Sequence, residues 1–226
     1  MTSTSIFRVK HLEPPPWLYA WMARGSLFRM IYRRFSADLA DLLPNGARVL
    51  DVGTGPGYLL AELVKARPDL DLWGLDLAHA MVRRGRRRQE ALNPRRPLKW
   101  LVADALALPF PAQAFDLAVA TFSFHIWPRP ATGLAEMWRI VKPGGRVWIY
   151  ELRREAPVSD LKAFAREEKL PFVLVYLGFQ ATSQFHALAA GDFNHILAEA
   201  AGESWHLRPV HRLFWQAELQ GLARRR

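Results

Sequence analysis

Short apolar runs alternate with segments of helical periodicity through the middle of this chain. The runs have the length and composition of buried strands and cover residues 49–52, 72–77, 100–105, 114–121 and 147–150. An amphipathic segment at 134–142 and a Pro-Gly-Gly stop precede the last of them. Strands that alternate with helices in this order pair in parallel, because each helix carries the chain back across the sheet. The pattern therefore predicts an α/β fold.

The flanking regions are less regular. Residues 14–43 hold two helical stretches rich in aromatic side chains, and residues 191–201 predict a helix that ends at Gly202. Residues 205–218 have the pattern of two further strands, with a turn near Pro209. The sequence shows no internal repeat and no low-complexity linker. We therefore expect one domain with a sizeable core.

A glycine-rich loop follows the first apolar run. It reads Asp51-Val52-Gly53-Thr54-Gly55-Pro56-Gly57 and leads into an apolar-periodic helix. Glycine lets the backbone approach a ligand that a Cβ would displace, so we expect room for a ligand over Gly53 and Gly55. The helix presents free N–H groups and a positive dipole end, which suit a carboxylate or a phosphate. A dinucleotide-binding loop would need its third glycine at position 58, where this chain has Tyr58.

Two later runs also end in, or are followed by, an acid. Asp76 closes the second run at the spacing expected for a ribose partner. Asp104 closes the third run, where its carboxylate can accept from an exocyclic amine. Because the carboxyl ends of parallel strands meet at one edge of a sheet, these acids should lie near the glycine loop. The combination is more specific than the loop alone.

At this point the chain resembles the class I S-adenosylmethionine-dependent methyltransferases. Within them it is most similar to the small-molecule branch that includes the ubiquinone and menaquinone biosynthesis C-methyltransferases. The signature blocks are the glycine loop, Asp76, residues 104–110, Phe115-Asp116 and residues 134–145, within a match over residues 45–152. The resemblance implies a Rossmann-like α/β fold: a seven-stranded, mostly parallel sheet with an antiparallel last strand and helices on both faces.

The same resemblance implies roles for individual residues. S-adenosylmethionine would be the cofactor and S-adenosylhomocysteine its product. The implied cofactor-binding residues are Asp51, Gly53, Thr54, Gly55, Gly57, Asp76, Leu77, Asp104, Ala105 and Thr121. The glycine loop would cradle the methionine part, and Asp51 would support the loop and the methionine amino group. Asp76 would hold the ribose hydroxyls, and Asp104 with the Ala105 backbone would read the adenine.

The resemblance also suggests how the chain is divided. Residues 1–43 would form an N-terminal helical lid over the cofactor, and residues 44–226 the methyltransferase domain. Within the domain, residues 160–188 would be an insertion that sets acceptor specificity. Aromatic residues of these segments and of the loop after the fourth run are expected to line the substrate pocket: Trp17, Tyr19, Trp127 and Tyr176.

One imidazole stands in the loop after the fourth run. Methyl transfer from a sulfonium is an in-line displacement that depends mainly on positioning and a dry pocket, so a base is optional. His125 is placed to act as that base if the acceptor is a phenol, an enol or a ring carbon. The alternative is a histidine packed under the lid with both nitrogens satisfied. His186 is a second candidate.

Composition excludes several chemistries. The 226 residues include no cysteine, which rules out disulfides, cysteine-metal sites and a cysteine nucleophile. The spacing of His, Asp and Glu shows no metal site. No apolar run reaches 18 residues, so we expect no membrane span. Residues 1–10 lack the apolar core of a signal peptide, which predicts a cytoplasmic location.

Charge keeps other functions open. The formal net charge is +10, and arginines are densest at residues 83–88 and 224–226. These clusters predict either a solvated surface or an RNA-binding patch. The loop at 121–128 is aromatic and apolar and lacks the motif for N-methylation of an exocyclic amine, which favours a small apolar or aromatic acceptor over RNA. An RNA methyltransferase and a non-catalytic S-adenosylmethionine-binding interaction protein remain alternatives. A dehydrogenase is disfavoured by Tyr58 and by the lack of a Tyr-x-x-x-Lys pair. The oligomeric state is left open.

Overall fold

The computed structural model describes residues 26–92, 98–201 and 205–220. Its strands are β1 (Arg48–Val52), β2 (Asp71–Asp76), β3 (Lys99–Val102), β4 (Phe115–Thr121), β5 (Val141–Arg153), β6 (Ala187–Leu188), β7 (His206–Val210) and β8 (Phe214–Gln220). Its helices are α2 (Ser26–Ala40), α3 (Tyr58–Ala66), α4 (His79–Leu92), α5 (Pro130–Ile140), α6 (Val158–Glu167), α7 (Phe172–His186), α8 (Ala190–Ala201) and the 3-10 helix η1 (Phe124–Ile126). The five apolar runs correspond to β1–β5, as predicted.

The strands form one sheet in the order β3-β2-β1-β4-β5-β8-β7, and the two-residue β6 pairs with β5. β8 runs antiparallel to both of its neighbours, whereas the pairs among β1–β5 are parallel. The predicted mostly parallel sheet with an antiparallel last strand is confirmed, with β6 as a short addition. The strand order reverses between β1 and β4, and open α/β sheets bind ligands at the carboxyl edge of such a switch point.

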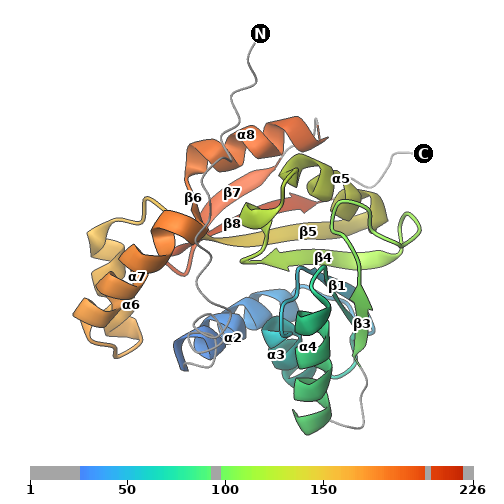
Figure 1. The fold of residues 1–226 in the computed structure, drawn as a ribbon, viewed down its shortest axis with the longest axis horizontal. Helices are drawn as coiled ribbons and strands as arrows, with labels where there is room; N and C mark the ends of the chain where they lie inside the picture. Colours follow the sequence, from blue (N-terminus) through green and yellow to red (C-terminus); the bar gives the residue numbers. More distant parts are fainter. Residues whose placement is uncertain (1–25, 93–97, 202–204, 221–226) are drawn as a thin grey trace.

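Helices cover both faces of the sheet (Figure 1). α2, α3 and α4 lie on one face and α5 and α8 on the other, while α6 and α7 extend past the end of β5. Successive residues of β5 alternate between two cores: Trp148 and Tyr150 belong to one, and Val147 and Ile149 to the other. This burial on both sides explains the continuous apolar runs of the central strands. Among the described helices, none has the length and apolar character of a membrane span.

The described part of the predicted N-terminal lid is helix α2. Its apolar face is buried against the sheet and α3, and Phe35 stacks on Tyr150 with ring centroids 4.0 Å apart. The Tyr150 hydroxyl donates to Asp38 of the same helix at 3.3 Å. α2 is therefore an integral part of the helical layer on this face. Trp17 and Tyr19, two of the predicted pocket residues, lie outside the described residues.

The two predicted last strands are confirmed as β7 and β8, but the turn between them lies later than expected. Pro209 lies within β7 and pairs with Trp215, and the chain reverses two residues further on, at His211 and Arg212, both of which have positive φ (46° and 65°). A proline removes one backbone donor, which an edge strand tolerates. β7 is the edge of this sheet, so proline did not mark the turn here.

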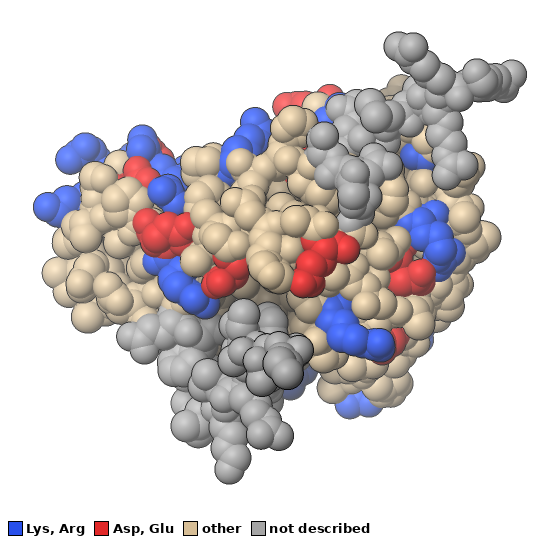
Figure 2. All heavy atoms as spheres, turned by 90° about the horizontal axis from the view of Figure 1, so that it is seen from above, with Lys and Arg blue, Asp and Glu red and all other residues tan. Residues whose placement is uncertain are grey.

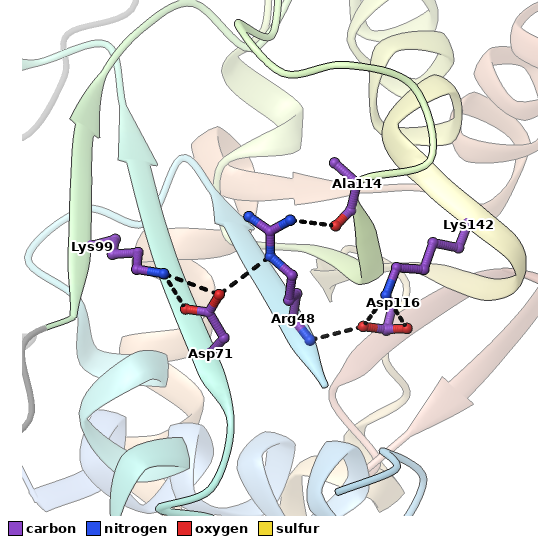
Figure 3. A network of polar contacts seen from close by, with 6 residues as sticks. All are labelled: Arg48, Asp71, Lys99, Ala114, Asp116 and Lys142. Carbon is purple, nitrogen blue, oxygen red and sulfur yellow. Dashed lines mark hydrogen bonds and ion pairs between the residues drawn. The ribbon is translucent and has the colours of Figure 1, made fainter. Parts of the chain in front are cut away.

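Alternating charges tie together the amino ends of five neighbouring strands (Figure 3). Lys99 of β3 lies 2.8 Å from Asp71 of β2, whose carboxylate also accepts from Arg48 Nε of β1 at 3.2 Å. The Arg48 backbone N–H donates to Asp116 of β4 at 2.8 Å, and Asp116 in turn pairs with Lys142 of β5 at 2.9 Å. Both acids are thus paired with cations of neighbouring strands, and the network links the five strands at the amino edge.

Three glycines shape a slot for the indole ring of Trp100 on β3. A Cβ added at Gly57, Gly74 or Gly85 would approach ring atoms of Trp100 to 2.3, 3.0 and 2.4 Å respectively. These glycines come from the loop before α3, from β2 and from α4. Trp100 therefore fastens α4 and the glycine loop to the sheet edge.

We expect Gly85→Ala to lower the free energy of unfolding by about 1–2 kcal/mol. The added Cβ would meet a ring that the other two glycines leave no room to move, and this overpacking outweighs the better helix propensity of alanine. Gly178→Ala is the matched control, because Gly178 also lies within a helix and its Cβ would meet nothing within 4 Å. It should raise stability by about 0.4–1 kcal/mol. Urea unfolding measures the free energy of unfolding of both variants. Equal values would contradict the claim that Gly85 makes room for the Trp100 ring.

Candidate functional site

The glycine loop leaves β1 with three left-handed glycines. Gly53, Gly55 and Gly57 have φ values of 70°, 55° and 72°, a region that side chains disfavour. A Cβ at Gly53 would lie 2.5 Å from Ser123, whereas one at Gly55 would meet nothing within 4 Å. The expectation of ligand room over both glycines is therefore corrected. Ser123 occupies the space beside Gly53, and the open space is at Gly55.

The loop is held against the end of β2. The Thr54 backbone N–H donates to the Leu75 carbonyl at 2.9 Å, and the Gly55 N–H donates to Asp76 Oδ2 at 2.8 Å. Asp76 Oδ1 accepts from the Ala78 N–H at 2.8 Å. Burial raises the pKa of this half-buried carboxyl, while the two backbone hydrogen bonds oppose the rise. Asp76 thus lies beside the open space at Gly55, and each of its oxygens has a second lone pair for a ligand hydroxyl.

Asp51, at the start of the loop, is fully buried. Its Oδ2 accepts from the Thr54 hydroxyl at 2.7 Å, but its Oδ1 makes no hydrogen bond within the described part of the chain. Burial raises the pKa of Asp51 to about 7, and the nearby charge of Asp76 adds to the rise. A buried carboxylate oxygen without a donor is costly, and a ligand ammonium group would supply one. The residues at this point therefore fit the amino group of S-adenosylmethionine.

The next two strand ends complete the carboxyl edge. Asp104 is exposed, and its Oδ1 accepts from the Leu106 N–H at 2.9 Å in a turn that buries Ala105. Leu77 and Val102 are 70% and 42% exposed where β2 and β3 end. Exposed apolar side chains at the ends of β2 and β3, with an exposed carboxylate two residues after β3, suit a flat, amine-bearing ring. Thr121, at the end of β4, is buried.

A second cluster of polar residues lies where β4 and β5 end. Glu151 of β5 is fully buried, and its Oε1 accepts from the backbone N–H groups of Phe124 (2.8 Å) and His125 (3.2 Å). Its Oε2 lies 2.9 Å from His125 Nδ1. His125 Nε2 lies 3.1 Å from Nδ1 of His186, which α7 contributes from 61 residues along the chain. The two predicted histidines are therefore adjacent, and the Glu151 carboxylate contacts His125 on the side opposite to His186.

Glu151 is the residue that sequence reasoning missed. The signal was present, because an acid directly follows the apolar run at 147–150, just as Asp76 and Asp104 lie at the ends of the second and third runs. With Glu151 accepting from His125 Nδ1–H, the neutral imidazole presents a lone pair at Nε2. That nitrogen faces His186, so both ring nitrogens of His125 have partners in the structure, as in the alternative of a packed histidine with satisfied nitrogens.

The predicted pocket residues have different surroundings. Trp127 is buried: its ring packs edge-on against Phe124 with centroids 5.3 Å apart and fills the space beside Gly133. Tyr176 is half-buried on α7, with its ring 5.7 Å from that of Phe172. A contact between either residue and a substrate stays a prediction.

Part of the arginine run on α4 is used within the molecule. Arg86 donates to the Trp100 carbonyl at 3.1 Å. Arg88 donates to the Pro56 carbonyl at 3.2 Å, and its guanidinium lies 4.0 Å from the centroid of the Tyr58 ring. These contacts brace the glycine loop. On the face that carries α5 and α8, acidic and basic side chains are interspersed (Figure 2).

Comparison with known proteins gives consistent matches. The sequence model of a family described as a methyltransferase domain matches residues 49–145. A demethylmenaquinone methyltransferase from Thermus thermophilus is 35% identical over 158 residues, which cover 69% of this chain and 69% of that protein. The ubiquinone/menaquinone biosynthesis C-methyltransferase UbiE from Dinoroseobacter shibae is 39% identical over 111 residues, 49% of this chain. That alignment spans only 44% of the length of the Dinoroseobacter protein.

Solved structures show the same fold. A SAM-dependent methyltransferase from Aquifex aeolicus superposes with a TM-score of 0.61 at 20% identity, over 81% of this chain and 87% of that one. The plantazolicin methyltransferase BpumL, solved in complex with SAH, gives a TM-score of 0.60 at 14% identity, over 86% of this chain and 83% of that one.

Proposed function

Because this chain belongs to the class I S-adenosylmethionine-dependent methyltransferases, we propose that it methylates a small, apolar or aromatic acceptor in the cytoplasm. The acceptor would be a quinone precursor, as the name of its demethylmenaquinone methyltransferase relative indicates. The observation that carries the proposal is the buried Oδ1 of Asp51, which has no donor within the described residues and lies in the loop that also presents Gly55. S-adenosylmethionine supplies an electrophilic methyl group when it is bound.

The residues of the carboxyl edge would share the binding of this cofactor. Asp51 would accept from its amino group, with Thr54 fixing the carboxylate. The open backbone at Gly55 would adjoin the methionine part, and Asp76 would accept from the ribose hydroxyls. Asp104 would accept from the adenine amine, and Leu77 would cover the ring. Gly53 and Gly57 would act indirectly, by allowing Ser123 and Trp100 to pack against the loop.

The histidine pair would handle the proton that the acceptor loses. A phenolic or ring-carbon acceptor gains a methyl group and gives up one proton, so a base near the acceptor is useful. His125 is proposed as this base. Because its Nδ1 faces Glu151 and its Nε2 faces His186, the acceptor proton would reach it through the imidazole of His186, which passes its own Nδ1 proton to His125 Nε2 over their 3.1 Å contact. Glu151 would orient His125 and offset the charge of the imidazolium. Its own contact with the acceptor is not required.

Calorimetric titration with S-adenosylmethionine tests the cofactor assignment. Asp76→Asn is expected to weaken binding by about 1–3 kcal/mol, the usual cost of a hydrogen bond lost from a desolvated partner. Asp71→Asn is the matched control, because both acids are half-buried on β2 but Asp71 lies at the amino edge and pairs with Lys99 and Arg48 (Figure 3). It should affect stability and leave the affinity unchanged.

The same titration discriminates between enzyme classes. NAD should not bind, and a radiolabelled methyl group should pass to a demethylmenaquinone-type naphthoquinol. Binding of NAD in place of S-adenosylmethionine would overturn the proposed function. Tight cofactor binding without transfer to any quinol would leave the family assignment intact and remove the proposed acceptor.

A further inference from the structure

Helix α7 is apolar on its outer face as well as on its inner face. Its inner residues Val175 and Phe179 are buried. Its outer residues Val173, Leu174 and Leu177 are 62%, 66% and 58% exposed. No residue of α7 is an acid, a lysine or an arginine. A surface helix normally turns polar residues to water, so this outer face, formed by Val173, Leu174 and Leu177, indicates a non-aqueous partner.

Three exposed cations lie on α6 and in the turn that leads to α7: Lys162, Arg166 and Lys169. The structure gives none of them an ion-pair partner among the described residues. Lys162 Nζ lies 5.7 Å from the ring centroid of Phe172, which places this lysine beside the first turn of α7. Figure 2 shows basic side chains at the end of the molecule formed by α6 and α7 (left). We refer to Lys162, Arg166 and Lys169 as the basic rim.

The acids near the basic rim are neutralised by other residues. The pairs are Asp160 with Arg153, Glu167 with Arg212, and Glu168 with Arg34. All three partners belong to elements outside the α6–α7 hairpin. The rim therefore keeps its positive charge, which an anionic surface would complement.

We propose that the outer face of α7 and the basic rim dock on the surface of an anionic lipid bilayer. An apolar helix face flanked by Lys and Arg binds at the lipid interface: the apolar side chains enter the acyl boundary and the cations meet the headgroups. The carboxyl end of the same helix carries His186, at the candidate site, about 20 Å along the helix from Val173. This inference rests on the proposed function in one respect, that an apolar acceptor would reach the site from the bilayer.

Vesicle sedimentation of the full chain tests the docking. Wild-type protein should bind phosphatidylglycerol-containing vesicles better than pure phosphatidylcholine vesicles. Leu174→Glu should reduce the partition coefficient by about tenfold or more, because a charge replaces an apolar side chain that would enter the acyl boundary of the bilayer. Leu42→Glu is the matched control: it is the same substitution at another exposed leucine, 45% exposed, in the segment after α2. It should bind as wild type does.

The basic rim makes its own contribution. Each of Lys162→Gln, Arg166→Gln and Lys169→Gln should lower binding to anionic vesicles by about fivefold and leave binding to neutral vesicles unchanged. Circular dichroism of each variant verifies that the fold is retained. Lack of vesicle binding by wild type, or wild-type binding by Leu174→Glu, would overturn the proposal. So would a wild-type dimer that Leu174→Glu dissociates without any vesicle binding, because a second copy would then cover the face.

Activity measurements keep this proposal separate from the proposed function. Leu174→Glu should bind S-adenosylmethionine and methylate a tail-free, water-soluble quinol as wild type does. Vesicle binding without methylation of any quinol would refute the proposed function and leave the docking surface intact. Methylation without vesicle binding would refute the docking surface and leave the proposed function intact.

Discussion

Mixing S-adenosylmethionine with the wild-type chain at pH 6 is expected to release close to one proton. Burial raises the pKa of Asp51 to about 7, so the ligand-free carboxyl is mostly protonated at this pH. The ligand amino group, whose ordinary pKa is about 7.7–8.0, is charged at pH 6. An ammonium next to Asp51 favours the carboxylate, so its proton must leave on binding. Calorimetry in buffers of different ionisation enthalpy counts that proton.

Asp51→Asn should abolish the proton release and weaken binding by about tenfold or more. The amide keeps the size of the side chain and can still accept from the Thr54 hydroxyl, but it cannot ionise. Asp116→Asn is the control, because Asp116 is an acid of the amino edge that pairs with Lys142. It should release the same proton as wild type. A wild-type titration without proton exchange at pH 6 would contradict the role of Asp51.

The same residue makes the stability of the ligand-free chain dependent on pH. The pKa of Asp51 is higher in the folded chain, about 7, than its ordinary value of 3.8, so the folded state binds the proton more tightly. This contribution to stability is fully present below pH 3.8 and is lost as the pH rises through 7. Its size is on the order of 4 kcal/mol. In urea unfolding, the free energy of unfolding of Asp51→Asn should lack this dependence on pH. Saturation of wild type with the ligand should offset the loss of stability at high pH.

Glu151→Gln is expected to lower kcat for a quinol acceptor by about 100-fold or more and to leave the affinity for S-adenosylmethionine unchanged. The amide oxygen can still accept from the backbone N–H groups of Phe124 and His125. Its NH2 group would face His125 Nδ1 and donate to it, which moves the imidazole proton to Nε2. His125 would then have no lone pair toward His186 and could not take up a proton there.

Cofactor affinity and thermal stability separate this effect from a structural one, because Glu151→Gln should keep both while kcat falls. His125→Gln should reproduce the loss. Glu218→Gln is the matched control, because Glu218 is a half-buried glutamate of β8 that pairs with Arg146 away from the histidines. Loss of thermal stability or cofactor affinity in Glu151→Gln, parallel to the loss of kcat, would make Glu151 a structural residue only.

The central fold could be predicted because its signals are local. Each of β1–β4 is a short apolar run, and the residues that end these runs lie at one edge of a parallel sheet for topological reasons alone. Asp51, Gly55, Asp76 and Asp104 were therefore predictable as neighbours. The need for glycine at position 53 was not predictable, because the space beside it is filled by Ser123, which follows another strand.

The missing parts depend on tertiary packing. The contact between His125 and His186 joins residues 61 positions apart and requires α7 to return to the sheet, which no local pattern records. The turn at His211 was misplaced because proline marks a turn in most contexts, and only the edge position of β7 makes Pro209 compatible with a strand. Glu151 follows the apolar run directly, but its burial and its contact with His125 depend on the packing of η1 against β5.

The alternating charges at the amino edge have a consequence for folding. The hydrogen bond from the Arg48 backbone to Asp116 spans 68 residues, so it forms only when β1 and β4, which are neighbours in the sheet but not in sequence, have come together. Without the neighbouring strands, Asp116 or Asp71 would have part of its hydrogen-bonding capacity unused. A half-assembled sheet is therefore disfavoured, and the five strands gain their stability together. The amino edge thus contributes to the cooperativity with which this sheet forms.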